Sequence, residues 1–444
     1  MKYKKYPSYK HSGVEWFGEI PSEWGIKKLK YISSIQTGST PLTSNDSYFS
    51  DEIGIPWIKP DELNNLVPIK TSKKFLTEKG KNISRIIKKD SVLVCGIGTI
   101  GKFGIAGVAL TTNQQINSVT FNNKLNFNYG KFLIASSQQE MDKFSNGNVV
   151  KILNTESQKN IDYPFPSFEE QQQIANFLDK ATAKIDILIE KQTKLIEILK
   201  EKRQAVISHA VTKGINPNVP MKDSGVEWLG EIPEHWELSK LRFLFSFSTG
   251  LNITKANLID DGMPCVSYGE IHSKYGFEVN ADINDLKYVD YEYLITSKSS
   301  LLSKGDFIFA DTSEDVKGAG NFTHIVGDTK VFAGYHTVIA RLKDNYNSRF
   351  FAYVFDSNVF RTQIQLAIKG VKVFSITQAI LKNCSIWFPF IEEQQQIANY
   401  LDDKTSKIDT LIEKSNKSIE LLREKRTALI SAAVTGKIDV REEV

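Results

Sequence analysis

Glu169-Glu-Gln-Gln-Gln-Ile-Ala-Asn-Phe-Leu-Asp179 returns later in the chain as Glu392-Glu-Gln-Gln-Gln-Ile-Ala-Asn-Tyr-Leu-Asp402. The match extends beyond this motif, because residues 169–215 and 392–438 share 32 identities in 47 positions. From position 169 to position 392 the displacement is 223 residues, about half of the 444-residue chain. Self-similarity at a fixed displacement indicates that one structural unit occurs twice.

A second repeated segment opens each copy of the unit. Ser12-Gly-Val-Glu-Trp-Phe-Gly-Glu-Ile-Pro-Ser-Glu-Trp24 recurs as Ser224-Gly-Val-Glu-Trp-Leu-Gly-Glu-Ile-Pro-Glu-His-Trp236. Residues 25–166 and 237–391, in contrast, show almost no alignable identity. Each copy therefore has a nearly fixed frame around a variable insert, a pattern that one shared partner and two different ligands would produce. A recent duplication that diverged unevenly is the alternative.

The segment after Pro166 has the pattern of a long helix, which we expect over 167–212. Ser167 followed by Glu170 forms a capping box, and Gly214 with Pro217 ends the pattern. We expect the second helix and its tail over 389–444, with a weaker start because Phe390 replaces the serine. About 42 residues would form a rod of roughly 60 Å.

Apolar residues in both helices alternate in steps of three and four, which is the spacing of a coiled-coil seam. The predicted seam consists of Ile174, Leu178, Ile185, Leu188, Gln192, Leu195 and Leu199, and of Ile397, Leu401, Ile408, Leu411, Ser415 and Leu422. Two copies of one helix would pair antiparallel, which brings the C-terminus beside the first variable domain. Gln192 and Ser415 would then be polar seam positions that fix the register. A helix pair inside the core of one domain is the alternative.

The variable regions predict two mixed α/β (α+β) domains, over 1–166 and 213–388. Strand-like runs at 91–95, 307–310 and 337–342 alternate with short helical patterns near 130–144 and 348–366. The order of the strands cannot be derived from this pattern.

Composition limits the class of protein without identifying its function. No apolar run approaches the roughly 18 residues of a membrane span. Cys95, Cys265 and Cys384 are few and far apart, which suits a reducing compartment, so we expect a cytoplasmic protein. Residues 1–166 carry 22 Lys and Arg against 14 Asp and Glu, whereas residues 216–391 carry 17 against 20. A basic first domain is compatible with phosphate binding, but the second offers no such argument.

Catalytic motifs are not found in the sequence. Gly96-Ile-Gly-Thr-Ile-Gly101 fits a dinucleotide fingerprint, but a strand-like run follows it and no Asp or Glu lies between Asp90 and Glu140. A glycine-rich hairpin that brings Lys102 near a phosphate, or a plain tight turn, explains it better. There is no phosphate-binding G-x-x-x-x-G-K-[ST] loop, no Asn/Asp-Pro-Pro-aromatic signature of amino-methyltransferases and no metal spacing among the six histidines. We therefore expect no catalysis and no metal site in this chain.

The repeated segments resemble those of the specificity subunits of Type I restriction–modification enzymes. The resemblance rests on the paired Glu-Glu-Gln-Gln-Gln-Ile-Ala-Asn segments, the paired Ser-Gly-Val-Glu-Trp segments and the helix ends with Glu-Lys-Arg, Ile-Ser and Ala-Val-Thr. It covers nearly the whole chain and implies two target-recognition domains, each reading one half of a split double-stranded DNA sequence. The helices would set the spacing and dock two methyltransferase subunits, through which motor-nuclease subunits join. S-adenosylmethionine, ATP and Mg are then expected only on these partner subunits.

Candidate DNA-binding residues are polar and lie near glycines or strand ends. Base reading needs amides and bidentate cations in loops, with lysines and hydroxyls to hold the backbone. In the first domain they are Thr37, Gly38, Ser39, Lys59, Thr99, Lys102, Asn113, Gln114, Gln115, Asn146 and Lys151. In the second they are Thr249, Tyr268, Thr312, Ser313, Lys317, Tyr335, His336, Lys369 and Lys372. For each one, an ordinary surface loop is the competing interpretation.

Two other functions stay open at this point. A methyltransferase that acts alone would bind its cofactor, and the absent motifs argue against it. A non-catalytic coiled-coil scaffold with two cargo domains would show no salt-dependent affinity for duplex DNA, whereas a DNA-reading subunit would show a steep one.

Overall fold

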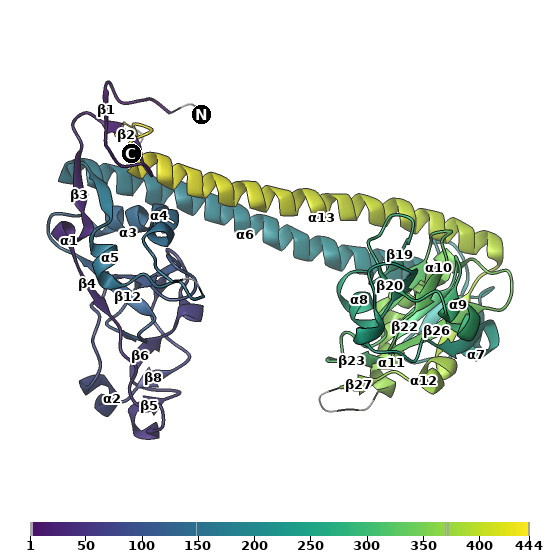
Figure 1. Cartoon of the computed structure of the whole chain (residues 1–444). Coiled ribbons are helices and arrows are strands. Elements are labelled where there is room, and N and C mark those ends of the chain that lie inside the picture. Colours follow the sequence, from purple (N-terminus) through teal and green to yellow (C-terminus); the bar gives the residue numbers. More distant parts are fainter. Residues whose placement is uncertain (1–2, 148, 369, 371–372, 443–444) are drawn as a thin grey trace. The chain divides into compact units, whose positions relative to one another are not determined.

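The computed structural model describes residues 3–147, 149–368, 370 and 373–442. The chain forms two compact units, Met1–Thr193 with Lys417–Val444, and Lys194–Asn416. Each unit combines one mixed α/β domain with half of each of two long helices (Figure 1). The boundary between the two compact units thus crosses both helices near their middle, whereas the boundaries expected from sequence lie at the ends of the domains and of the long helices.

The long helices are α6 (Phe168–Lys213) and α13 (Ile391–Val434). Ser167 Oγ accepts a hydrogen bond from the backbone N–H of Glu170, which confirms one half of the predicted capping box at the start of α6. The carboxylate of Glu170 instead accepts a hydrogen bond from the hydroxyl of Tyr6. Gly214 and Gly436 follow the helix ends with φ angles of 75° and 71°, the left-handed conformation that favours glycine at this place.

The two helices run antiparallel within each unit, as predicted. In the first unit Ile174 and Leu178, near the start of α6, share a core with Ala433 near the end of α13. In the second unit the order is exchanged, because Ala210 near the end of α6 shares a core with Ile397 near the start of α13. The C-terminal segment packs on the first domain, since Tyr129 donates a hydrogen bond to the carbonyl of Val434.

Three of the predicted seam residues are wrong. Leu188, Leu195 and Leu411 are 47%, 42% and 49% exposed. The residues that follow them, Ile189, Ile196 and Ile412, are half-buried in their place. An α-helix has 3.6 residues per turn, so a strict 3.5-residue repeat drifts across its surface. At each of the three positions the leucine and the isoleucine that follows it are both apolar, so the sequence pattern does not show which of them is buried.

The remaining predicted seam residues are largely buried. The buried set is Ile174, Leu178, Ile185, Leu199, Ile397, Leu401, Ile408 and Ser415. Gln192 and Leu422 are half-buried. Ser415, only 6% exposed, is therefore a polar position among apolar neighbours of the same helix face.

Each domain contains a five-stranded and a four-stranded sheet. In the first domain the larger sheet has the order β4 (Ser33–Thr37), β12 (Ile116–Phe121), β9 (Val92–Cys95), β10 (Phe103–Ala106) and β7 (Pro68–Ile69). The smaller sheet has the order β11 (Thr111–Thr112), β6 (Ile55–Ile58), β8 (Phe75–Leu76) and β5 (Phe49–Ser50).

The second domain repeats the strand order of the larger sheet and of three strands of the smaller one, whose fourth strand lies at the opposite edge. Its larger sheet has the order β17 (Phe245–Thr249), β26 (Thr337–Leu342), β22 (Phe307–Ala310), β24 (Phe322–Ile325) and β19 (Glu278–Val279). Its smaller sheet has the order β20 (Lys287–Val289), β18 (Met263–Val266), β25 (Val331–Ala333) and β21 (Leu301–Leu302). The parallel pair of β6 with β11 corresponds to that of β18 with β25. Two regions without alignable sequence therefore share one fold.

Two-stranded sheets and short helices complete the domains. The paired strands are β1 (Tyr9–His11) with β2 (Glu19–Pro21), β3 (Gly25–Lys28) with β13 (Asp162–Phe165), β14 (Met221–Asp223) with β15 (Glu231–Pro233), β16 (Glu237–Lys240) with β28 (Ser385–Phe388), and β23 (Thr312–Ser313) with β27 (Phe374–Ser375). The helices are α1 (Leu29–Ile32), α2 (Glu78–Asn82), α3 (Phe127–Ser136), α4 (Gln138–Lys143), α5 (Thr155–Lys159), α7 (Leu241–Leu244), α8 (Tyr268–Ser273), α9 (Tyr293–Thr296), α10 (Ser348–Asp356), α11 (Asn358–Ala367) and α12 (Gln378–Asn383). The predicted strands and short helices are confirmed.

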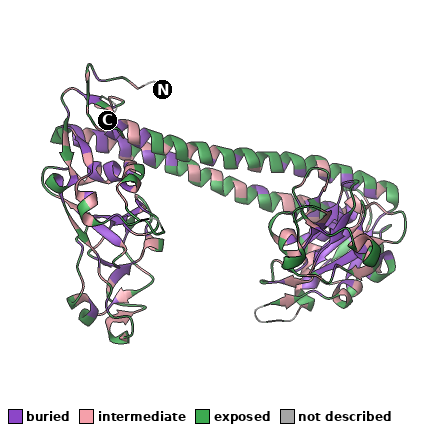
Figure 2. Ribbon diagram, viewed as in Figure 1, coloured by how far each residue is buried: buried purple, intermediate pink, exposed green. Residues whose placement is uncertain are grey.

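The buried residues gather where each domain meets its helix halves (Figure 2). In the second unit the largest core combines α10, the larger sheet and the helix ends, with Phe307, Phe322 and Phe355 at its centre. The long helices expose most of their remaining surface.

The repeated glutamines attach each domain to its long helix. Gln171 Oε1 accepts from the backbone N–H of Asn126 over 2.8 Å, and its Nε2 donates to the carbonyl of Pro166. Gln394 makes the same two bonds, with the N–H of Asn347 over 3.0 Å and the carbonyl of Pro389. Asn126 and Asn347 are the N-cap residues of α3 and α10, the domain helices that begin at these two joints.

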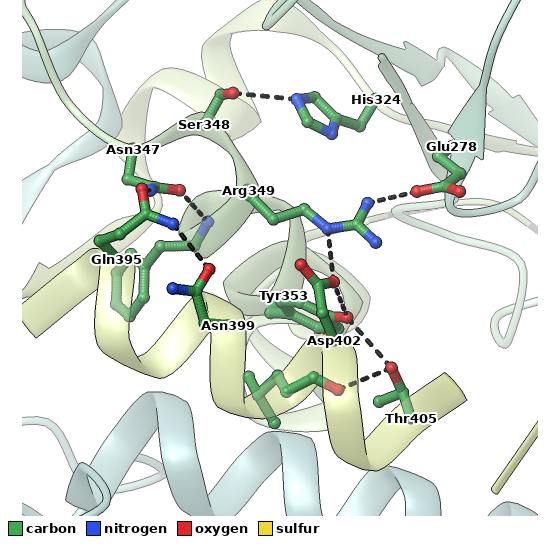
Figure 3. Close-up of polar contacts among 12 residues, drawn as sticks. Glu278, His324, Asn347, Ser348, Arg349, Tyr353, Gln395, Asn399, Asp402 and Thr405 are labelled. Atoms are coloured by element: carbon green, nitrogen blue, oxygen red, sulfur yellow. Dashed lines mark hydrogen bonds and ion pairs between the residues drawn. The ribbon is translucent and has the colours of Figure 1, made fainter. Parts of the chain in front are cut away.

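The last residue of the motif adds an ion pair at each joint. Asp179 lies 2.7 Å from the ammonium of Lys131, and Asp402 lies 2.8 Å from Nε of Arg349. Figure 3 shows the second joint, where Tyr353 also donates to Asp402. Much of the repeated motif is thus explained by contacts inside the chain, and these identities require no shared partner.

Candidate nucleic-acid interface

The predicted DNA-binding residues of the two domains lie in topologically equivalent segments. In the first domain the segments lie at the end of β4 (Thr37–Ser39), after β6 (Lys59), between β9 and β10 (Thr99–Lys102), between β11 and β12 (Asn113–Gln115) and before α5 (Asn146–Lys151). In the second domain the corresponding segments lie at the end of β17 (Thr249), after β18 (Tyr268), between β22 and β24 (Thr312–Lys317), between β25 and β26 (Tyr335–His336) and before α12 (residues 369–372). Lys369 and Lys372 lie outside the described residues.

Backbone hydrogen bonds bring the segments of the first domain together. The bonds run from Asn113 N to Ile58 O, Gly38 N to Ile116 O, Gly96 N to Gln115 O, Leu153 N to Gly96 O and Gly98 N to Lys151 O, at 2.7 to 3.2 Å. Thr99, Gln114, Asn146 and Lys151 are exposed in this cluster. The candidates therefore share one side of the domain, although they come from distant parts of the sequence.

Several candidates in the first domain have an internal role instead. The ammonium of Lys102 donates to the carbonyl of Pro60 over 2.7 Å. Asn113 is 7% exposed, and its side chain bonds to Gln115. Lys151 pairs with Asp142 over 2.5 Å. The expected glycine-rich hairpin is present, but its Lys102 is bonded to the Pro60 carbonyl of the same domain.

Gly38 and the equivalent Gly250 are required by packing. A Cβ on Gly38 would overlap Thr112 Oγ1 and the Asn113 carbonyl, and one on Gly250 would overlap Thr337 Oγ1 and the Gly334 carbonyl. Gly38 is also buried. Glycine therefore lets the segment after β4 or β17 approach the neighbouring loop, and DNA contact is not needed to explain it.

In the second domain most candidates surround one hollow of about 810 Å³. Its lining includes the predicted Tyr268, Thr312, Ser313, Lys317 and His336. The predicted Tyr335 contacts Tyr268 edge to face, with ring centroids 5.6 Å apart. His336 has a φ of 56°, uncommon outside glycine, and its Nδ1 lies 3.2 Å from Asp311.

Sequence reasoning missed eight residues of this hollow. They are Gly269, His272, Glu314, Asp315, Gly318, Asn321, Arg361 and Val373. His272 Nε2 bonds to the carbonyl of Thr312, and Asn321 Nδ2 bonds to His272 Nδ1. Arg361 Nη2 donates to the carbonyl of Lys317 and to Asn321 Oδ1. Arg361 lies on α11, within a helical pattern, so no turn or glycine pointed to it.

The described residues offer no centre for metal chemistry. Within them, no group of three or more His, Cys, Asp or Glu side chains could hold a metal ion. Cys95, Cys265 and Cys384 are buried and free, and burial raises the pKa of Cys265 and of Cys384 to about 12. Among the helices that the structure describes, none combines the length and apolar character of a membrane span.

Comparison with known families agrees with this geometry. Residues 21–199 and 233–421 match the family model described as the Type I restriction modification DNA specificity domain. The chain belongs to this family. The resemblance seen in the repeated segments is therefore confirmed, and each of the two matched segments includes one domain and part of a long helix.

Relatives of this family match the whole chain. The Type I restriction enzyme MjaIX specificity subunit of Methanocaldococcus jannaschii is 26% identical over 459 residues, covering 100% of this chain and 99% of that protein. The MjaVIII specificity subunit of the same organism is 22% identical and covers 95% of this chain and 94% of that protein. A structure from work on complex assembly and conformational transition of the type I R-M system has the same fold, with a TM-score of 0.64 at 14% identity over 94% of this chain and 98% of that one.

Proposed function

We propose that this protein is the DNA specificity subunit of a Type I restriction–modification enzyme, with each domain reading one half of a bipartite target. One observation carries the proposal. Two domains of one fold present equivalent segments, and these segments differ in sequence while the helical frame is repeated. Such a chain holds two different readers in one arrangement, which is what a split sequence needs.

The paired helices would set the distance between the half-sites and dock two methyltransferase subunits. Leu188 and Leu411 occupy equivalent positions, as do Ile198 and Leu421, and all four are between 47% and 53% exposed. Apolar residues that stay exposed at repeated positions are typical of a surface that a partner covers. Their repetition supports two equivalent docking surfaces, one for each methyltransferase.

Catalysis would belong to these partners. S-adenosylmethionine would bind to the methyltransferases, and ATP and Mg to the motor-nuclease subunits that join the complex through them. This assignment rests on the missing catalytic motifs and on the family, in which the chain supplies recognition. The three buried thiols support a reducing compartment, the cytoplasm.

Mapping of methylated adenines in the host genome tests the proposal. The expected result is an interrupted motif, two short half-sites around a fixed gap, which disappears when the gene is deleted. A continuous motif, or one that survives the deletion, would contradict it. Duplex binding by the purified complex should also fall steeply as salt rises, whereas a scaffold without DNA affinity would show no such dependence.

A further inference from the structure

The hollow of the second domain contains a guanidinium without a carboxylate partner. Arg203, Arg341 and Arg349 are similarly enclosed, and each pairs with an aspartate within 3.2 Å. Arg361 has no ion pair within the described residues. Its Nε is buried without an acceptor, and its Nη1 donates no hydrogen bond there. Burial lowers the pKa of Arg361, although Asp356 and Asp315 act in the opposite direction.

An enclosed cation without an ion pair is costly, because it has lost water and gained only counter-charges beyond ion-pair distance, those of Asp356 and Asp315. Two bonds from Nη2, to Lys317 O and Asn321 Oδ1, fix the guanidinium at the wall of the hollow. Nη1 is left free to donate. The position is thus prepared for an acceptor that comes from outside the chain.

The neighbours of Arg361 indicate the chemistry of that acceptor. Glu314 and Asp315 line the same hollow, beside the rings of Tyr268 and His336. A surface that binds phosphates alone would exclude carboxylates, because like charges repel. A base-pair edge in the major groove offers donors and acceptors side by side, and a wall that carries both kinds of group matches it.

We propose that this hollow reads a G·C base pair of the second half-site. Arg361 donates through Nη1 to O6 or N7 of the guanine, and Glu314 accepts from the amino group of the cytosine. These are the pairings that Arg and Glu make with base edges. The inference rests on the proposed function and adds to it the residues and the base pair at one position of the target.

The test uses the complete complex with its methyltransferase and two variants, Arg361→Gln and Glu314→Gln. The second half-site is defined as the half that changes when residues 237–391 are exchanged. Arg361→Gln should lower affinity for the cognate duplex by about 10- to 100-fold and relax one G·C position of this half-site. Binding to duplexes with scrambled half-sites should change by less than about threefold, and the first half-site should be unaffected.

Glu314→Gln separates base reading from phosphate binding without a risk to folding. Glu314 is exposed and makes no hydrogen bond within the described residues. The proposal expects weaker discrimination at the same base pair. Tighter binding of this variant to every duplex would show that a DNA phosphate lies near residue 314, and it would overturn the proposal. The matched control is Arg242→Gln, at an exposed arginine outside the hollow that bonds to Asn383.

Two results with Arg361→Gln would also overturn the inference. One is an equal loss of affinity on all duplexes, and the other is an unchanged second half-site. Failure of the wild-type complex to prefer any bipartite duplex would instead contradict the proposed function, so the two failures are distinguishable.

Discussion

Arg203 on α6 lies with its Nε 3.1 Å from a carboxylate oxygen of Asp409 on α13. The other unit contains the same pair with the helices exchanged, because Arg426 of α13 lies 2.9 Å from Asp186 of α6. The displacement of 223 residues converts 186 into 409 and 203 into 426. One contact is therefore built twice, which follows when two copies of one helix pair antiparallel.

The two pairs differ in what else the arginine holds, and this predicts unequal effects on stability. Arg203 also binds Asp356 over 2.9 Å, and that carboxylate is only 11% exposed. Arg203→Met leaves it enclosed without a partner and should lower the free energy of unfolding by about 3 kcal/mol. Arg426→Met removes one partly exposed pair and should cost less than about 1 kcal/mol. Urea unfolding measures both; equal losses would contradict the role given to Asp356.

The glutamine motif predicts a second contrast, within three adjacent residues. Gln171→Ala and Gln394→Ala each strand a backbone N–H and a carbonyl at a domain joint. Each should cost about 3 kcal/mol, since unsatisfied buried groups cost 1–3 kcal/mol apiece. Gln173→Ala is the control, because Gln173 makes no side-chain hydrogen bond within the described residues and is only half-buried. A destabilising control would show that the joint extends further than these bonds.

The frame of this protein was accessible from sequence because it occurs twice. The long helices, their antiparallel pairing and the cap at Ser167 followed from periodicity and repetition. The register of the seam failed at Leu188, Leu195 and Leu411, where each residue is followed by an isoleucine and pattern alone cannot choose between them.

The candidate interface was predicted only in part, for a physical reason. Turns and glycines located the segments but not the direction of the side chains. Lys102 has the positive charge expected of a phosphate contact, yet its ammonium donates a hydrogen bond to the Pro60 carbonyl. Arg361 was missed because it lies on a helix and reaches the hollow through tertiary packing.

The spacing role of the helices predicts the effect of a paired deletion. Removing residues 191–197 and 414–420 deletes seven residues from each helix and keeps both ion pairs, Arg203 with Asp409 and Arg426 with Asp186. Seven residues shorten an α-helix by about 10 Å, which corresponds to about three base pairs. Methylated-adenine mapping should therefore show a gap about three base pairs shorter with unchanged half-sites. Deleting seven residues from α6 alone should disturb pairing and abolish methylation, and altered half-sites after the paired deletion would contradict a pure spacing role.

His324 predicts how the second unit responds to acid. The imidazole is 4% exposed, stacks on Phe307 with ring centroids 4.8 Å apart and bonds through Nε2 to Ser348 Oγ (Figure 3). Burial and the positive charge of Arg349 lower the pKa of His324 from 6.5 to about 3. The folded protein therefore resists a proton that the unfolded chain accepts. The contribution of His324 to the free energy of unfolding is therefore fully present above pH 6.5 and is lost as the pH falls toward 3.

Between pH 7 and pH 5 the loss from this residue should be about 2 kcal/mol. The variant His324→Gln removes the titrating group and should show a pH dependence of unfolding that is weaker by this amount. Urea unfolding at the two pH values measures it, and His209→Gln, at an exposed residue of α6, controls for the change itself. If the variant and the wild type lose stability in parallel, protonation of His324 does not drive the acid response. The slope would then have to come from other titrating groups of the protein.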